Sequence, residues 1–88
     1  MHRSDAYAVA VAVLREFEAR PFSDLCDLVD EPPEETTTCH DGVEYQASTV
    51  VRAYGASGDS IKVETTVETR SSWRLERQVE ALVVNRRA

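Results

Sequence analysis

A chain of 88 residues, 42% of them hydrophobic, is long enough for one domain with a modest core, over residues 1–88, and is not disordered by composition. Its formal net charge of −6 is unevenly placed, with eight acidic residues and no lysine or arginine between Pro21 and Val51. This distribution argues against nucleic-acid binding, which needs clustered cations, and permits a basic protein partner.

The stretch from Asp5 to Arg20 predicts the helix around which the other elements pack. Its alternating alanines and valines are also a strand signal, but a half-buried strand would leave alanines as its polar face. Ser4 is expected to cap the first amides, and Pro21 to end the helix. The face predicted to be buried consists of Ala6, Val9, Ala10, Val13, Leu14 and Phe17. Val11 lies off this face and is either an isolated surface side chain or a partner contact.

The apolar run at the start of the chain bears on location. From Ala6 to Leu14 it is too short to span a membrane. It is followed by charged residues and not by a small-residue cleavage site, which makes it a poor signal peptide. We therefore expect a soluble, cytoplasmic protein without membrane contact.

Residues 22–30 predict a short helix over one end of the core, because Leu25, Leu28 and Val29 recur at helical spacing and Ser23 can cap the first turn. Pro32 and Pro33 then break the helix.

Two strands and a hairpin follow. The threonine-rich stretch 36–40 favours an extended chain, and Asp41-Gly42 is a strong type I′ turn signal that would pair His40 with Val43. A long strand over 43–54 and a second over 60–70 alternate between apolar and polar residues, which indicates a sheet covered on one face.

The last segment, residues 71–88, fits two structures. As a strand it would turn Trp73, Leu75, Val79, Ala81 and Val83 inward, with Arg77 as an exception and Glu80 outward. As a helix it would begin at Ser72 and leave Trp73 off the apolar stripe. The tryptophan and the two-residue spacer before it favour the strand.

These elements predict an α+β fold, with a long N-terminal helix across one face of an antiparallel sheet of three to four strands. The alternative is an α-β-β-α order with a C-terminal helix. The layout resembles a cystatin-like or nuclear-transport-factor-like arrangement at the level of the fold alone, and no motif in the chain identifies a family.

The spacing of the candidate catalytic and metal-binding residues gives only weak support for such sites. Cys39 and His40 point to opposite faces of a strand, which separates thiol from imidazole. Cys26, Cys39 and His40 lack the paired spacing of a zinc site, and the acidic residues form no calcium loop. Two cysteines are too few for a disulfide framework, so we expect reduced thiols, with a Cys26–Cys39 bridge as the alternative. We predict no catalytic residue, metal or cofactor.

The polar face of the sheet and the acidic segment favour contacts with protein. The leading prediction is a non-enzymatic interaction or accessory domain that is homodimeric and binds a protein partner. The acidic segment would suit a basic partner. The predicted docking residues are Asp27, Asp30, Glu31, Glu34, Glu35, Val50 and Tyr54. The strand 36–40 is a further candidate, as an edge that could pair with another chain.

The alternative function is a small-ligand or minor enzymatic pocket between the helix and the sheet, where pockets often form. The residues that could line it are Tyr7, Phe17, His40, Tyr45 and Trp73.

Overall fold

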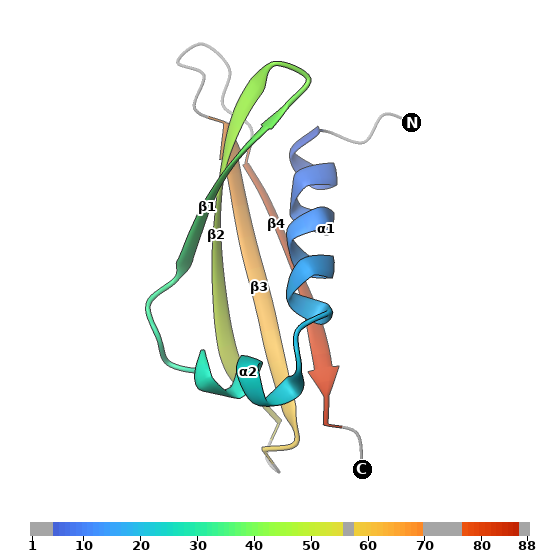
Figure 1. Ribbon diagram of the computed structural model, residues 1–88, viewed down its shortest axis with the longest axis vertical. Helices are drawn as coiled ribbons and strands as arrows, with labels where there is room; N and C mark the ends of the chain where they lie inside the picture. The colour runs from blue at the N-terminus through green and yellow to red at the C-terminus, as the bar shows by residue number, and fades with distance from the viewer. Residues whose placement is uncertain (1–4, 56–57, 70–76, 87–88) are drawn as a thin grey trace.

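A computed structural model describes residues 5–55, 58–69 and 77–86 of the chain. Two helices, α1 (Asp5–Glu18) and α2 (Phe22–Asp27), precede four strands. The strands are β1 (Glu34–His40), β2 (Val43–Tyr54), β3 (Ser60–Thr69) and β4 (Arg77–Asn85). They form one antiparallel sheet in the order β1-β2-β3-β4. Helix α1 lies across one face of this sheet, and α2 lies near its lower end as drawn in Figure 1.

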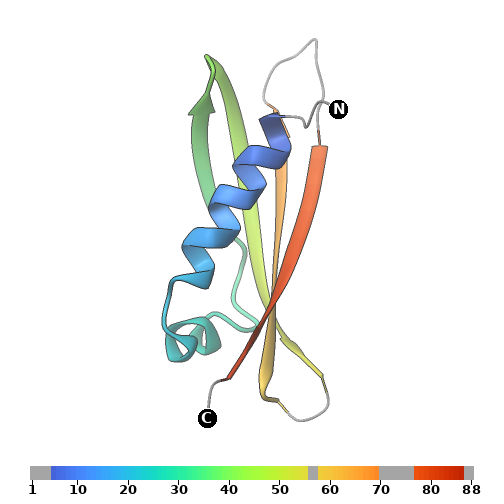
Figure 2. The ribbon, with the colours of Figure 1, turned by 90° about the vertical axis from the view of Figure 1, so that its right-hand side faces the viewer.

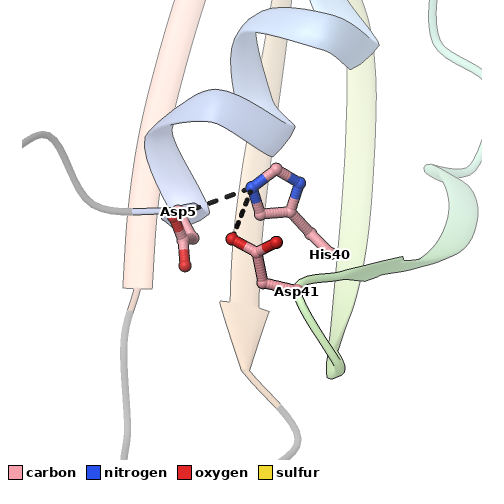
Figure 3. Close-up of side chains that lie close together, drawn as sticks. All are labelled: Asp5, His40 and Asp41. Atoms are coloured by element: carbon pink, nitrogen blue, oxygen red, sulfur yellow. Dashed lines mark ion pairs between the residues drawn. The ribbon is translucent and has the colours of Figure 1, made fainter.

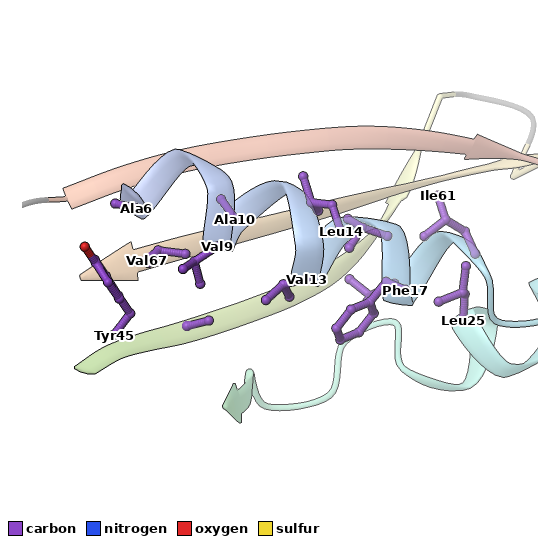
Figure 4. Packing of buried hydrophobic residues seen from close by; sticks show 13 residues of the cluster. Ala6, Val9, Ala10, Val13, Leu14, Phe17, Leu25, Tyr45, Ile61 and Val67 are labelled. Carbon is purple, nitrogen blue, oxygen red and sulfur yellow. The ribbon is translucent and has the colours of Figure 1, made fainter. Parts of the chain in front are cut away.

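Helix α1 buries the face expected from its sequence. Its buried residues are Ala6, Val9, Ala10, Val13, Leu14 and Phe17. They pack on the sheet along the length of the helix (Figure 4). The helix has 14 residues, so it is of ordinary length and not the long helix expected. Ser4, the expected cap, lies outside the described residues.

The turn between β1 and β2 confirms the expected hairpin. His40 pairs with Val43 and Thr38 with Tyr45. Asp41 and Gly42 both have positive φ, 52° and 77°, as a type I′ turn requires. Strand β1 begins at Glu34, two residues before the expected start.

Strands β2 and β3 alternate as predicted, because one face of each lies under α1. The buried positions are Tyr45, Ala47, Thr49 and Val51 on β2 and Ile61, Val63, Thr65, Val67 and Thr69 on β3. Thr49 and Thr65 are paired across the strands. The Oγ1 of Thr49 donates a hydrogen bond of 3.0 Å to the Oγ1 of Thr65, so that each buried hydroxyl has a partner inside the core.

Helix α2 closes the end of the core, as expected. Leu25 is fully buried, and Val29 forms a parallel bridge with Val51. The expected cap at Ser23 is wrong. Pro21 holds the cap position without a side-chain hydrogen bond, because the helix begins at Phe22, two residues earlier than a cap at Ser23 would place it.

The final segment is a strand, so the alternative with a C-terminal helix is wrong. The expected direction of its side chains is also wrong. Leu82 pairs with Val63 and Val84 with Ile61, which places the even-numbered residues of β4 on the side of α1. Val79, Ala81 and Val83 therefore face away from the helix, while Glu80 faces its side. A shift of one residue reverses every side chain of a strand.

The reversal follows from the register of β4 against β3. The expected alternation was carried back to Trp73 and required Arg77 as an exception. Strand β4 starts at Arg77, and residues 70–76 lie outside the described part of the chain.

Two further expectations concern the thiols and the membrane. Cys26 and Cys39 are free and exposed. Neither helix in the described ranges has the length and apolar character needed to cross a bilayer.

Candidate interaction surface

The face of the sheet turned away from α1 carries no covering element among the described residues (Figure 2). We call this the open face. Its side chains come from odd positions of β1 and β4 and from even positions of β2 and β3, as the strand register requires. It contains the following charged residues: Glu35, Glu44, Arg52, Lys62, Glu64, Glu68 and Arg77.

Charges on the open face are nearly balanced, unlike those of the whole chain. Glu68 lies 3.9 Å from Arg77, and Lys62 lies 3.8 Å from Glu64. Such exposed pairs contribute little to stability. Because its positive and negative residues nearly cancel, the open face lacks the negative electrostatic field of the acidic segment.

Among the described strands β4 is one edge of the sheet, and one contact shows which of its backbone groups point away from β3. The amide of Arg86 donates to the carbonyl oxygen of Asp59 at 2.8 Å, towards β3. In an antiparallel pair, backbone groups point alternately to the two sides of a strand. The even-numbered residues of β4 therefore bond to β3. The odd-numbered ones, from Arg77 to Asn85, direct N–H and C=O outward.

These outward-directed positions also carry exposed apolar side chains. Val79 is 46% exposed and Val83 is 43% exposed, with the exposed Ala81 between them. The opposite edge, β1, is polar over the same length, with three threonines and two glutamates. Natural edge strands are commonly blunted by charge, and the outward positions from Val79 to Val83 lack that protection.

Helix α1 adds an apolar side chain beside this edge. Glu18 shares a cleft with Val83 and Val84 of β4, so its flank of the helix faces that strand. Val11 precedes Glu18 by seven residues, or about two turns, and lies on the same flank. It is half-buried. Val11, which did not fit the core stripe, thus lies on the β4 side of the molecule.

A second cluster lies where α1 meets the β1–β2 turn (Figure 3). The Nε2 atom of His40 is 3.7 Å from Oδ1 of Asp5 and 3.7 Å from Oδ2 of Asp41. The potential ligand atoms of the three side chains all lie within 4.8 Å of one another. They could offer one nitrogen and two oxygens to a divalent cation.

Ion pairing accounts for this cluster without a metal. A protonated His40 would pair with both carboxylates, and all three side chains are at least 40% exposed. Asp5 and His40 are far apart in the sequence, so no spacing could have indicated their approach.

The residues expected to line a ligand pocket do not converge. Tyr45 lies beside the first turn of α1 near Ala6, whereas Phe17 lies towards the other end near Leu25 (Figure 4). Both are buried in the core, at 2% and 3% exposure. Tyr7 and His40 are half-buried, and Trp73 lies outside the described residues.

Two open clefts adjoin the helix. A groove of about 230 Å³ runs between α1 and β1 and is lined by Ala8, Val9, Ala12, Val13, Glu16, Thr36, Thr38 and His40. A wider cleft of about 600 Å³ lies at the carboxyl end of β4, beside Phe22, Arg20 and Arg86. Of the four expected pocket residues that the structure describes, only His40 lines either cleft.

The expected docking residues fall into two groups. Val50 and Tyr54 lie on the open face, with Tyr54 49% exposed. The acidic residues lie on α2, on β1 and on the link between them, and are exposed. Glu34 on β1 is already paired, since its Oε2 lies 3.2 Å from Nη1 of Arg20. The exposed valines of β4 were not among the expected residues, because the direction of that strand was misjudged.

Comparison of the chain with protein-family models, with curated proteins and with solved structures finds no match.

Proposed function

We propose that this chain is a non-catalytic protein-interaction domain that acts as a homodimer. The observation that carries the proposal is the edge of β4, where outward backbone groups coincide with exposed valines. An edge of this kind is a template for pairing with another chain. No catalytic role is needed to explain the side-chain groupings described above.

Charge supports a second copy as the partner on this side of the sheet. Each copy carries a formal charge of −6, so two copies repel each other, and the repulsion is weakest where they meet through a surface that is close to neutral. The open face and the outward positions of β4 form such a surface. The acidic residues of β1 lie at the opposite edge of the sheet from β4 and remain available for a basic protein.

A small-ligand site between the helix and the sheet is the less favoured proposal. The groove between α1 and β1, at about 230 Å³, falls below the usual range of ligand pockets, about 300–1,000 Å³. The cleft of about 600 Å³ at the end of β4 falls within that range but contains none of the expected pocket residues that the structure describes. Of the aromatic residues expected to line the ligand site, Phe17 and Tyr45 belong to the packed core.

Sedimentation velocity of the purified chain over a wide concentration range tests the homodimer. We expect a concentration-dependent shift from the monomer mass of 9.8 kDa to twice that mass. A protein that stays monomeric at every concentration up to about 1 mM contradicts the proposal. At this limit, association with a binding free energy weaker than about −4 kcal/mol would be missed.

A further inference from the structure

We infer that the two copies join through antiparallel pairing of β4 with β4 of the second copy, centred on Ala81, so that the two sheets become one. This inference rests on the proposed homodimer. It specifies the contact surface, the symmetry axis and the residues that face each other.

The backbone determines the centre of the pairing. A two-fold axis perpendicular to the sheet keeps both open faces on the same side, so paired residues must have the same parity. Strand β4 runs from Arg77 to Asn85, and its midpoint is Ala81. Only this centre pairs the whole strand, and it joins the five outward-directed positions to one another. Each such pair exchanges two hydrogen bonds, about ten in all.

Side chains match about the same centre. Val79 would lie opposite Val83 of the second copy, and Ala81 opposite its own symmetry mate. The apolar positions would form one strip along the joined open faces. Cross-strand pairs of β-branched residues stabilise a sheet. Shifting the centre to Glu80 would place two carboxylates opposite each other.

The helices leave room for this arrangement. Helix α1 packs mainly over β3 and β4, with less contact to β1 and β2. With strands spaced about 4.8 Å apart, the two α1 axes would then be roughly 10–14 Å apart. A helix with its side chains is about 10–12 Å across, so the helices would stand side by side. Val11 lies on the flank where they would meet.

One pair of side chains, Glu80 and its symmetry mate, opposes the association. Glu80 lies on the helix side of β4, where it accepts a hydrogen bond of 2.6 Å from Nε2 of Gln78. In the proposed register it faces Leu82 of the second copy. The two Glu80 carboxylates would be diagonal neighbours, with backbones about 7–8 Å apart. Their repulsion weakens the dimer, which provides a test with the opposite sign.

The first test removes an outward amide. Ala81→Pro deletes an N–H that points away from β3, and proline is tolerated at such edge positions. Thr37→Pro is the matched control, because its position in the middle of β1 lies between residues hydrogen-bonded to β2. By sedimentation, we expect Ala81→Pro to raise the dissociation constant at least about tenfold and Thr37→Pro to change it less than about twofold.

The second test keeps the backbone intact. Glu80→Gln should lower the dissociation constant about threefold, whereas Glu35→Gln, on the opposite edge, should lower it less. Circular dichroism of each variant checks that the monomer is folded. If Ala81→Pro does not fold, the effect of Glu80→Gln on the dissociation constant tests the β4 pairing without it.

The outcomes separate the two claims. A wild-type dimer that Ala81→Pro leaves unchanged, or that both proline variants weaken equally, overturns the β4 pairing but not the homodimer. A dimer that Glu80→Gln does not tighten relative to Glu35→Gln also counts against the pairing. A wild-type monomer removes both proposals.

Discussion

At the scale of single residues, the paired hydroxyls of Thr49 and Thr65 are an unusual use of the core beneath α1. Both side chains are buried, at 3% and 0% exposure, and each satisfies the other through one hydrogen bond of 3.0 Å. A buried hydroxyl is tolerated when it has a partner and is costly when that partner is lost.

A double-mutant cycle tests this pair. Thr49→Val or Thr65→Val alone leaves one buried hydroxyl without its partner, and we expect each to lower the free energy of unfolding by about 1–2 kcal/mol. The double variant should cost less than the sum, because it removes both polar groups. Urea denaturation measures the four proteins, and additive losses would show that the hydroxyls are not coupled.

Gly42 is the other residue with a sharp local role. Its φ of 77° is unfavourable for any residue with a Cβ, although no atom lies within 4 Å of where that Cβ would be. We expect Gly42→Ala to destabilise the protein by about 1 kcal/mol through backbone strain alone. Thermal unfolding monitored by circular dichroism measures this loss. Gly58→Ala, also at positive φ but in the β2–β3 connection, is the comparison for a glycine outside the hairpin.

At the scale of elements, α1 and the β1–β2 hairpin are the parts that the sequence predicts best. Six apolar side chains recur at helical spacing, and all six are buried. Asp41-Gly42 both permits the turn and fixes its register. In these two cases local chemistry and tertiary packing demand the same structure.

Strand β4 shows where the prediction fails. Apolar residues occur on both of its sides, with Val79 and Val83 on one and Leu82 and Val84 on the other. Alternation alone cannot choose between these sides, and the register against β3 decides. The exposure of Val79 and Val83 on β4 depends on this register. The candidate interaction surface could therefore not be located from the sequence. The contact between Asp5 and His40 was hidden for a related reason, since only the packing of α1 on the sheet brings them together.

Phe17 on the buried face of α1 and Val11 on its β4 side should respond differently to truncation to alanine. Phe17 is 3% exposed, and we expect Phe17→Ala to lower the free energy of unfolding by about 3–5 kcal/mol. Val11→Ala should cost the monomer less than about 1 kcal/mol, because the side chain is half-buried and alanine favours the helix. Urea denaturation at low protein concentration compares the two variants. A loss of similar size for both would place Val11 in the core.

At the scale of the whole molecule, the uneven charge makes association dependent on salt. Two copies with formal charge −6 repel, and ions screen that repulsion within about 10 Å at 0.1 M and about 3 Å at 1 M. We expect the homodimer to tighten several-fold between 50 mM and 500 mM NaCl.

Salt also distinguishes the two kinds of partner. A basic protein bound to the acidic residues of α2 and β1 would be released over the same range, because screening weakens attraction between unlike charges. Sedimentation at several salt concentrations measures the homodimer, and titration calorimetry measures any basic partner. A homodimer that weakens with salt would mean that the charged surface, and not β4, forms the contact.

The order of the strands has a consequence for how the chain folds. Each strand pairs with the strand beside it in sequence, so the sheet can grow by local hairpins, whereas α1 must wait for β3 and β4. During synthesis the helix leaves the ribosome first, with its apolar face uncovered until the rest of the domain follows. We therefore expect the sheet to form by a sequence of short-range steps and docking of the helix to complete the core.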